Sequence, residues 1–157
     1  METLAAAATC RHTRIRVETR RPTEFIDVTD RIESIVAEAG IDDGLVNIHT
    51  LHTTTAVVVN EHEPLLLADF ATLLARTAPE HAPYRHDDMA ARTVNLAAGE
   101  RPNGHAHCRA LLLGGSTSLN LAGGRLQLGR WQRIFLVELD GPRSRKLSVL
   151  VLGGGGR

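Results

Sequence analysis

Two histidines separated by a single residue give the strongest local indication of chemistry in this sequence. His105 and His107 begin the segment 105–113, which we interpret as a β-strand. Side chains at positions i and i+2 of a strand point to the same side, about 7 Å apart, so two imidazoles could bind one metal ion. The third ligand would come from His52, His86, Asp69 or Glu138. The alternative is a surface histidine next to Gly104.

A second pair of histidines, His49 and His52, has a spacing that places them on opposite faces of a strand. The segment 45–59 is rich in Thr, Val and Ile, and we expect one long strand or a hairpin pair. The side chains expected on the same face as His52 are Thr54, Ala56, Val58 and Asn60. For a lone histidine, a core position with satisfied hydrogen bonds is the alternative to a functional role.

Glu138 lies in an apolar segment, 131–140, which is predicted to be a strand. Gln132 would share its face. A carboxylate in apolar surroundings is costly unless it is paired or binds a cation. Its candidate partners are Arg143, Arg145, a histidine or a metal ion, and a structural Glu–Arg pair stays open beside a functional role. Arg143 could also act as a forked anion ligand after the turn that begins at Asp140.

Several other kinds of chemistry lack their sequence signatures. Ser116 follows two glycines but lacks the GxSxG pattern, and neither a P-loop nor GxGxxG is present. Cys108 has the opposite strand parity from His107, so we expect a buried, unreactive thiol. Basic residues are not interleaved with aromatic residues, which argues against binding of single-stranded nucleic acid.

The elements that must position these residues are predicted from periodicity and turn signals. We expect a helix from Thr29 or Asp30 to Gly40, and a second helix from Pro64 with the apolar stripe Leu66, Phe70, Leu73 and Leu74. An irregular stretch follows over 77–104. The expected strands are 13–20, 45–59, 105–113, 117–121, 124–129, 131–140 and 145–152. Helices early and antiparallel strands late predict an α+β fold with a β-sandwich-like core and two to three helices.

Strand 131–140 carries apolar side chains on both faces, with Ile134 and Leu136 on one and Phe135 and Val137 on the other. Such a strand must be covered on both sides by a second sheet, a helix or another subunit. A homo-oligomer is therefore expected.

Length and composition favour an ordinary globular domain. The chain has 157 residues, 43% apolar and 23% charged, with a net charge of zero. This balance gives no overall attraction to nucleic acid or to an anionic membrane. We expect a frayed or disordered N-terminus over 1–12, one domain over 13–152 and a flexible tail over 153–157. Two cysteines outside any CxxC pattern, no convincing signal peptide and no long apolar run favour a cytoplasmic protein.

Several motifs in order along the chain resemble those of one known family. They are His52-Thr53-Thr54-Thr55-Ala56, Asn60-Glu61, Tyr84-Arg85-His86-Asp87, Asn103-Gly104-His105-Ala106-His107, Leu113-Gly114-Gly115-Ser116, Leu128-Gly129-Arg130-Trp131-Gln132 and Glu138-Leu139-Asp140-Gly141-Pro142-Arg143. The chain resembles the YjbQ-like family, also called the secondary thiamine-phosphate synthase family, from about Thr13 to Leu152. Arg130 departs from the small hydroxyl residue that is usual in the family.

The resemblance implies an α+β fold with a sandwich-like core, commonly assembled as a trimer, and a polar site. The counterparts of family site residues are His52, Asn60, Glu61, His86, His107, Gln132, Glu138 and Arg143. Within this site we expect catalytic roles for His52, Glu61, Glu138 and Arg143. We expect substrate contacts from Asn60, Asn103, Ser116, Gln132 and Arg143. The residues expected to bind a divalent metal, zinc above all, are His107, His86, His105 and His52, with His105 less secure than His107.

The leading functional hypothesis is a weak thiamine-phosphate synthase activity, which joins an aminopyrimidine diphosphate to a thiazole phosphate. A departing pyrophosphate needs a cation or arginine beside it. However, Mg²⁺-pyrophosphate sites are rich in carboxylates, whereas histidines suit zinc. The alternatives are a metal-dependent hydrolase with Glu138 or Glu61 as general base, and a non-catalytic trimer that binds a metal or a small phosphorylated metabolite. In each case we expect His52, His107 and Glu138 to converge in one pocket, with Arg143 at its rim.

Overall fold

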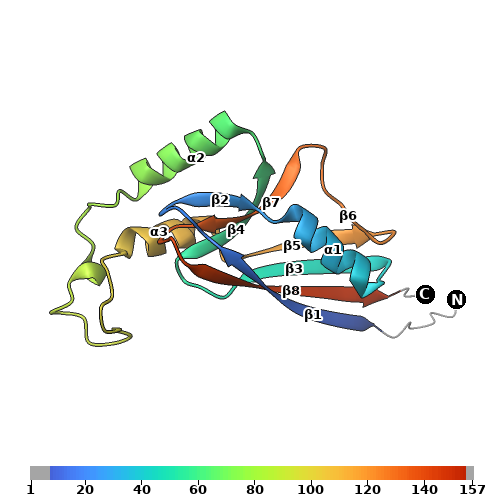
Figure 1. The fold of residues 1–157 in the computed structure, drawn as a ribbon, viewed down its shortest axis with the longest axis horizontal. Helices are drawn as coiled ribbons and strands as arrows, with labels where there is room; N and C mark the ends of the chain where they lie inside the picture. Colours follow the sequence, from blue (N-terminus) through green and yellow to red (C-terminus); the bar gives the residue numbers. More distant parts are fainter. Residues whose placement is uncertain (1–7, 155–157) are drawn as a thin grey trace, which may run out of the picture.

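A computed structural model describes residues 8–154, which fold into two antiparallel sheets and three α-helices (Figure 1). The elements are β1 (Thr9–Glu18), β2 (Glu24–Asp27), α1 (Thr29–Ala39), β3 (Asp43–Thr50), β4 (Thr55–Glu61), α2 (Pro64–Thr77), the 3₁₀ turn η1 (Arg85–Asp87), α3 (Gly104–Leu113), β5 (Ser116–Ala122), β6 (Arg125–Leu126), β7 (Gln132–Glu138) and β8 (Ser144–Gly154). The α+β class and the sandwich-like core expected from the sequence are confirmed.

The larger sheet has the strand order β1-β8-β3-β5-β6, and the smaller has the order β2-β7-β4. The main core lies between the two sheets and α1. Ile32 of α1, Ile48 of β3, Leu136 of β7 and Val149 of β8 meet there, and each is fully buried. Every second side chain of β3, β5 and β8 points toward this core, and so does every second one over 13–17 of β1, where the sequence predicts alternation.

A second core covers the opposite face of the smaller sheet. Phe135 and Val137 of β7 pack there with Leu74 of α2 and Ala106 of α3. Both faces of β7 are therefore covered within one chain, by a sheet on one side and by helices on the other. The prediction of a strand covered on both sides is confirmed, but these faces no longer argue for an oligomer.

Helix α1 ends and helix α2 begins at the expected signals, whereas the N-cap of α1 is Val28 and not Thr29 or Asp30. Helix α1 ends at Gly40, which has a left-handed φ of 64°, a conformation that costs glycine little. Helix α2 starts at Pro64, and the Glu63 carboxylate accepts hydrogen bonds from the backbone N–H groups of Leu65 and Leu66. No helix of residues 8–154 has the length and apolar character needed to cross a membrane.

The strand predicted over 105–113 is wrong, because this segment is helix α3. Its apolar contacts, Ala106, Ala110 and Leu113, recur at helical spacing. The Asp87 carboxylate accepts hydrogen bonds from the N–H groups of Asn103 and Gly104, at 2.9 and 2.8 Å, and so stabilises the start of the helix from sixteen residues upstream. Residues two apart on a helix point in different directions, so the expected pairing of His105 with His107 fails.

The segment 45–59 is neither one strand nor a hairpin pair. Its two halves belong to different sheets, since β3 pairs with β5 and β8 while β4 pairs with β7. Residues 51–54 carry the chain from one sheet to the other. His52 therefore lies in a connection, and the face that it was expected to share with Asn60 does not exist.

Three further expectations need correction. Leu73 was placed in the apolar stripe of α2 but is 60% exposed, and of the four stripe residues only Leu74 is buried. Cys108 was expected to be buried but is exposed on α3. Strands β1 and β8 extend over 9–18 and 144–154, beyond the expected domain boundaries at 13 and 152. The expectations for residues 1–7 and 155–157 lie outside the described part of the chain.

Candidate functional site

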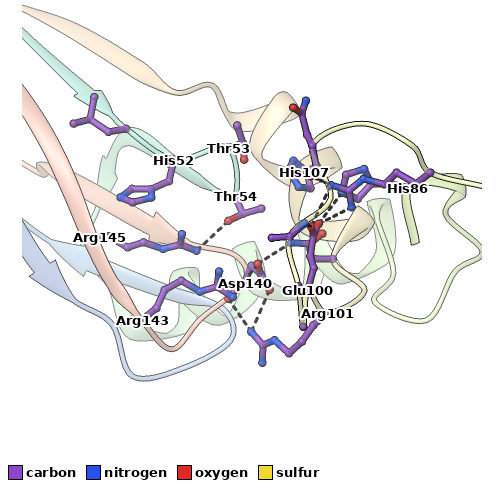
Figure 2. Close-up of a pocket in the computed structure, with 17 residues that line it drawn as sticks. His52, Thr53, Thr54, His86, Glu100, Arg101, His107, Asp140, Arg143 and Arg145 are labelled. Atoms are coloured by element: carbon purple, nitrogen blue, oxygen red, sulfur yellow. Dashed lines mark hydrogen bonds and ion pairs between the residues drawn. The ribbon is translucent and has the colours of Figure 1, made fainter. Parts of the chain in front are cut away.

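A pocket of about 740 Å³ opens at one end of the sandwich, between two walls of different origin. Figure 2 shows His52, Arg143 and Arg145 on one side, and His86, His107 and Glu100 on the other. The first wall comes from the connection 51–54 and the turn between β7 and β8. The second comes from the long loop that precedes α3 and from α3 itself. The irregular stretch over 77–104 thus supplies much of one wall.

The sandwich wall is held by a buried ion pair. Glu138 is fully buried and accepts hydrogen bonds from Arg145 Nε at 2.6 Å and from the Thr19 hydroxyl at 2.9 Å. Its other oxygen accepts the backbone N–H groups of Leu139 and Asp140. Burial raises the pKa of Glu138, but the hydrogen bonds, that from Arg145 above all, outweigh it and hold the pKa below its usual range.

Glu138 is therefore satisfied by protein partners and does not line the pocket. Arg145 does line it and donates a second hydrogen bond to the Thr54 hydroxyl at 3.0 Å. Among the candidate partners of Glu138 considered from the sequence, Arg145 is the one that pairs with it in the structure. This geometry is that of a structural pair which fixes Thr54 and Arg145 in the wall.

A single carboxylate anchors the floor between the walls. Asp140 is 7% exposed, and its oxygens receive Arg143 at 3.1 Å, Arg101 at 3.4 Å and the Asn103 amide at 2.9 Å. Two guanidinium groups thus share one negative charge. Arg143 and Arg101 remain partly exposed, so each can also bind an anion in the pocket.

His52 is fixed in one tautomer by the neighbouring strand. The backbone N–H of Lys146 donates to His52 Nε2 at 2.9 Å, and a backbone N–H can only donate. The neutral ring must therefore carry its proton on Nδ1. Burial, followed by the charge of Arg145, lowers the pKa of His52, so the imidazole is neutral at pH 7. His52 can donate one hydrogen bond from Nδ1, but its Nε2 is not free to bind a metal or to accept a substrate proton.

The opposite wall brings two other histidines together. The rings of His86 and His107 have centroids 4.5 Å apart. Burial, and then the charge of His86, lowers the pKa of His107, so this imidazole is also neutral at pH 7. Glu100 lies 3.8 Å from His86 Nε2 and is held by Arg92. This wall offers imidazole nitrogen atoms beside a carboxylate that is already paired.

The pair of histidines meets part of what a metal site requires. His86 Nε2 is buried and has no hydrogen-bond partner among the described residues, as a donor atom held for an ion would be. Neutral imidazoles suit zinc. However, nowhere in residues 8–154 do three or more His, Cys, Asp or Glu side chains form a group able to hold a metal ion. The donor set is incomplete without a ligand or another group.

The structure does not bring all the expected site residues together. His52, His86, Asn103, His107 and Arg143 line the pocket, whereas Asn60, Glu61, His105, Ser116, Gln132 and Glu138 do not. Glu61 pairs with Gln132 at one end of β4, and Thr55 pairs with Glu138 at the other. Glu138 contacts Arg145, which lines the pocket, and six residues of strand span roughly 20 Å. Asn60, Glu61 and Gln132, at the other end of the paired strands, therefore lie far from the pocket. His105 is buried and points elsewhere, and burial lowers its pKa.

Other lining residues escaped the sequence analysis. Arg92, Arg101 and Glu100 lie in the irregular loop, where no periodicity identifies a side chain. Asp140 was read only as the start of a turn. The one available signal was the concentration of arginine and acidic residues within this long loop, since long ordered loops often carry function.

The fold and the site define a class of protein: a two-sheet α+β sandwich with a pocket at one end that is lined by histidine and arginine. The family profile described as UPF0047 protein YjbQ-like matches residues 13–154. The chain belongs to this family, which confirms the resemblance found in the sequence.

Individual relatives agree with this assignment. A UPF0047 protein of Methanothermobacter thermautotrophicus is 37% identical over 137 residues, covering 87% of this chain and 88% of the relative. The UPF0047 protein YugU of Bacillus subtilis is 31% identical over 140 residues, which is 88% of this chain and 97% of the relative. The crystal structure of a YbjQ-like protein of unknown function from Sulfolobus solfataricus has a TM-score of 0.85 and 36% identity, covering 94% of this chain and 99% of that one.

Proposed function

We propose that the pocket binds a small phosphorylated metabolite. The observation that carries this proposal is the sharing of Asp140 by Arg101 and Arg143. Four arginines and two carboxylates line the pocket, so the lining carries a net charge of two positive. Glu138, which pairs with Arg145 behind the wall, neutralises one of these two charges. One guanidinium charge therefore remains for a ligand. Guanidinium groups bind phosphate through paired, charge-assisted hydrogen bonds.

The reaction that this pocket supports best is transfer with departure of pyrophosphate, as in thiamine-phosphate synthase. Arg143 and Arg101 would bind the leaving group and stabilise the charge that develops on it. His52 would donate a hydrogen bond from Nδ1. His107, neutral at pH 7 because of its lowered pKa, is the side chain best placed to accept a proton. In this proposal Glu138 and Glu61 have no chemical role.

A second candidate function is metal-assisted hydrolysis of a phosphorylated substrate. The buried His86 Nε2 without a partner, beside His107, favours it. His86 and His107 would hold the ion, with zinc the best match to imidazole nitrogen, and the ion would supply an activated water. Metal analysis after reconstitution with zinc tests this, and His86→Gln and His107→Gln should each abolish retention of the ion. Equal zinc content in wild type and both variants would exclude this site.

We also propose that the chain forms a homotrimer. Leu111 is 85% exposed and Leu112 61% exposed on α3, and Leu65 is 76% exposed on α2. Such leucines favour burial against another subunit. The number three comes from the family resemblance. Light scattering that finds a monomer at micromolar concentration would contradict this proposal.

Calorimetric titration with inorganic pyrophosphate tests the main proposal. Wild type should bind, and Arg143→Gln should bind about 10- to 100-fold more weakly, since one charge-assisted hydrogen bond contributes about 1.5–3 kcal/mol. Arg31→Gln, an equal loss of charge at an exposed position on α1, is the matched control and should bind like wild type. No binding by wild type at millimolar pyrophosphate would refute the pocket's assignment.

An activity assay then separates the reaction classes. Aminopyrimidine diphosphate and thiazole phosphate are supplied together, with and without a chelator. Thiamine phosphate formed in both conditions supports the transferase without a metal. Phosphate released only without the chelator supports the hydrolase, and binding without turnover identifies a metabolite-binding protein.

A further inference from the structure

The outer face of the larger sheet carries a row of cations next to the pocket. Arg16 lies opposite Lys146 across β1 and β8, and Arg14 lies opposite Ser148. Val17, Arg145 and Leu147, which alternate with these residues along the two strands, are buried. The side chains of Arg14, Arg16 and Lys146 therefore point outward. All three are exposed. Residues directly opposite one another on an antiparallel pair have Cβ atoms about 5 Å apart, and neighbours along one strand face are about 7 Å apart.

These cations form no close ion pair within the protein. None of Arg14, Arg16 and Lys146 forms an ion pair with a described residue. Glu18, exposed two residues beyond Arg16 on the same face of β1, brings one opposite charge, so these four side chains together keep an excess of two positive charges. Most surface charges are simply solvated, and a functional role therefore requires a link to a site.

That link is made by the backbone of Lys146. Its N–H donates to His52 Nε2, and its carbonyl accepts the N–H of Leu51 at 3.1 Å. Both Leu51 and His52 line the pocket. The charge of Lys146 also contributes to lowering the pKa of His52, after burial and Arg145. The row thus begins where the wall of the pocket ends.

We propose that Lys146 and Arg16 form a second anion subsite, so that the preferred ligand carries phosphate groups at two separated ends. One end binds Arg143 and Arg101, and the other passes His52 to reach Lys146. This inference rests on the proposed function and narrows its substrate class to bisphosphorylated molecules. Lys146 lies three residues after Arg143, and three residues of extended chain span about 10 Å. A phosphate and a pyrophosphate alone are too short to span both subsites.

The test compares hexanediol bisphosphate, hexyl phosphate and pyrophosphate on wild type, Lys146→Met and Arg16→Gln. Wild type should bind the bisphosphate more tightly than hexyl phosphate. Each variant should lose about fivefold in affinity for the bisphosphate, the effect of one charge interaction near a solvated surface. Both should bind pyrophosphate as wild type does, and Arg31→Gln should bind all three probes unchanged.

The two proposals fail in different ways. Pyrophosphate binding by wild type together with equal affinities for the bisphosphate in wild type and Lys146→Met would overturn the second subsite alone. Absence of pyrophosphate binding would overturn the pocket itself. A labelled single-stranded oligonucleotide is the last probe: binding that Lys146→Met abolishes, without any preference for the bisphosphate, would assign the row to nucleic acid and overturn the proposal.

Discussion

Replacement of Glu138 by Gln separates a structural from a chemical role for this carboxylate. The change keeps the shape of the side chain and removes its charge, leaving the Arg145 guanidinium, which is 3% exposed, without its counter-ion. Breaking a buried pair by removing one partner costs about 3–5 kcal/mol. For a domain of this size each kcal/mol lowers Tm by about 2–4 °C, so we expect a fall of roughly 6–20 °C.

Thermal unfolding and urea denaturation measure this loss, and pyrophosphate titration well below the transition measures the pocket. Glu138→Gln combined with Arg145→Met is the informative companion, because it also removes the unpaired charge while the Gln amide oxygen can still accept the backbone N–H groups of Leu139 and Asp140. The double variant should recover much of the lost free energy of unfolding. Glu61→Gln, at the far end of β4, serves as a control and should unfold like wild type. An unchanged Tm for Glu138→Gln, with binding abolished, would refute the structural role.

Three further predictions follow from local geometry. Burial raises the pKa of Asp27, but hydrogen bonds from Thr29 and Arg133 together outweigh it and lower the pKa to about 2 from 3.8. Its contribution to stability, about 2 kcal/mol, is therefore present above pH 4 and lost between pH 4 and 2, and Asp27→Asn should remove that part of the acid-denaturation curve. Asp87→Ala should cost about 1–2 kcal/mol by removing the acceptor at the start of α3, measured by urea denaturation; a neutral result would show that water replaces it. Cys108 and Cys10 are both exposed in the single chain, and Cys108 lies one turn before Leu111 and Leu112 on α3. A thiol reagent should therefore titrate Cys10 readily but Cys108 slowly in the proposed trimer, and both thiols in a monomer; a trimer in which both react readily would place this face of α3 outside the interface.

Local pattern was enough to predict most of the framework. The alternation over 13–18 and the signals at Pro64 and Gly40 depend only on neighbouring residues, and β1, α2 and α1 formed as expected. Helix α3 was predicted as a strand because His105 and His107 have an i, i+2 spacing, although Ala106, Ala110 and Leu113 recur at helical spacing. The start of α3 is also stabilised by the Asp87 carboxylate, which accepts a hydrogen bond from the N–H of Asn103. A local sequence pattern does not predict a cap that is sixteen residues away.

The candidate site was only partly predictable for a related reason. The residues that line it meet through long-range contacts, such as the bond from Lys146 to His52 and the sharing of Asp140 by Arg101. Motifs indicate that Asn60 and His52 matter, but not that His52 lies in the connection before β4 while Asn60 lies near the far end of that strand. Only the crossing of the chain between two sheets at residues 51–54 decides that.

The position of β8 has a consequence for how the protein is made. The last strand of the chain is inserted between the first, β1, and the third, β3, rather than added at an edge (Figure 1). During synthesis the edges of β1 and β3 that face β8 therefore stay unpaired until residues 144–154 have left the ribosome. Pairing between strands so distant in sequence slows folding. Arg143 and Arg145 arrive in the same final step. A chain that stops short of β8 would lack the interior of its larger sheet and one wall of its pocket together, so completion of the fold and assembly of the site are a single event.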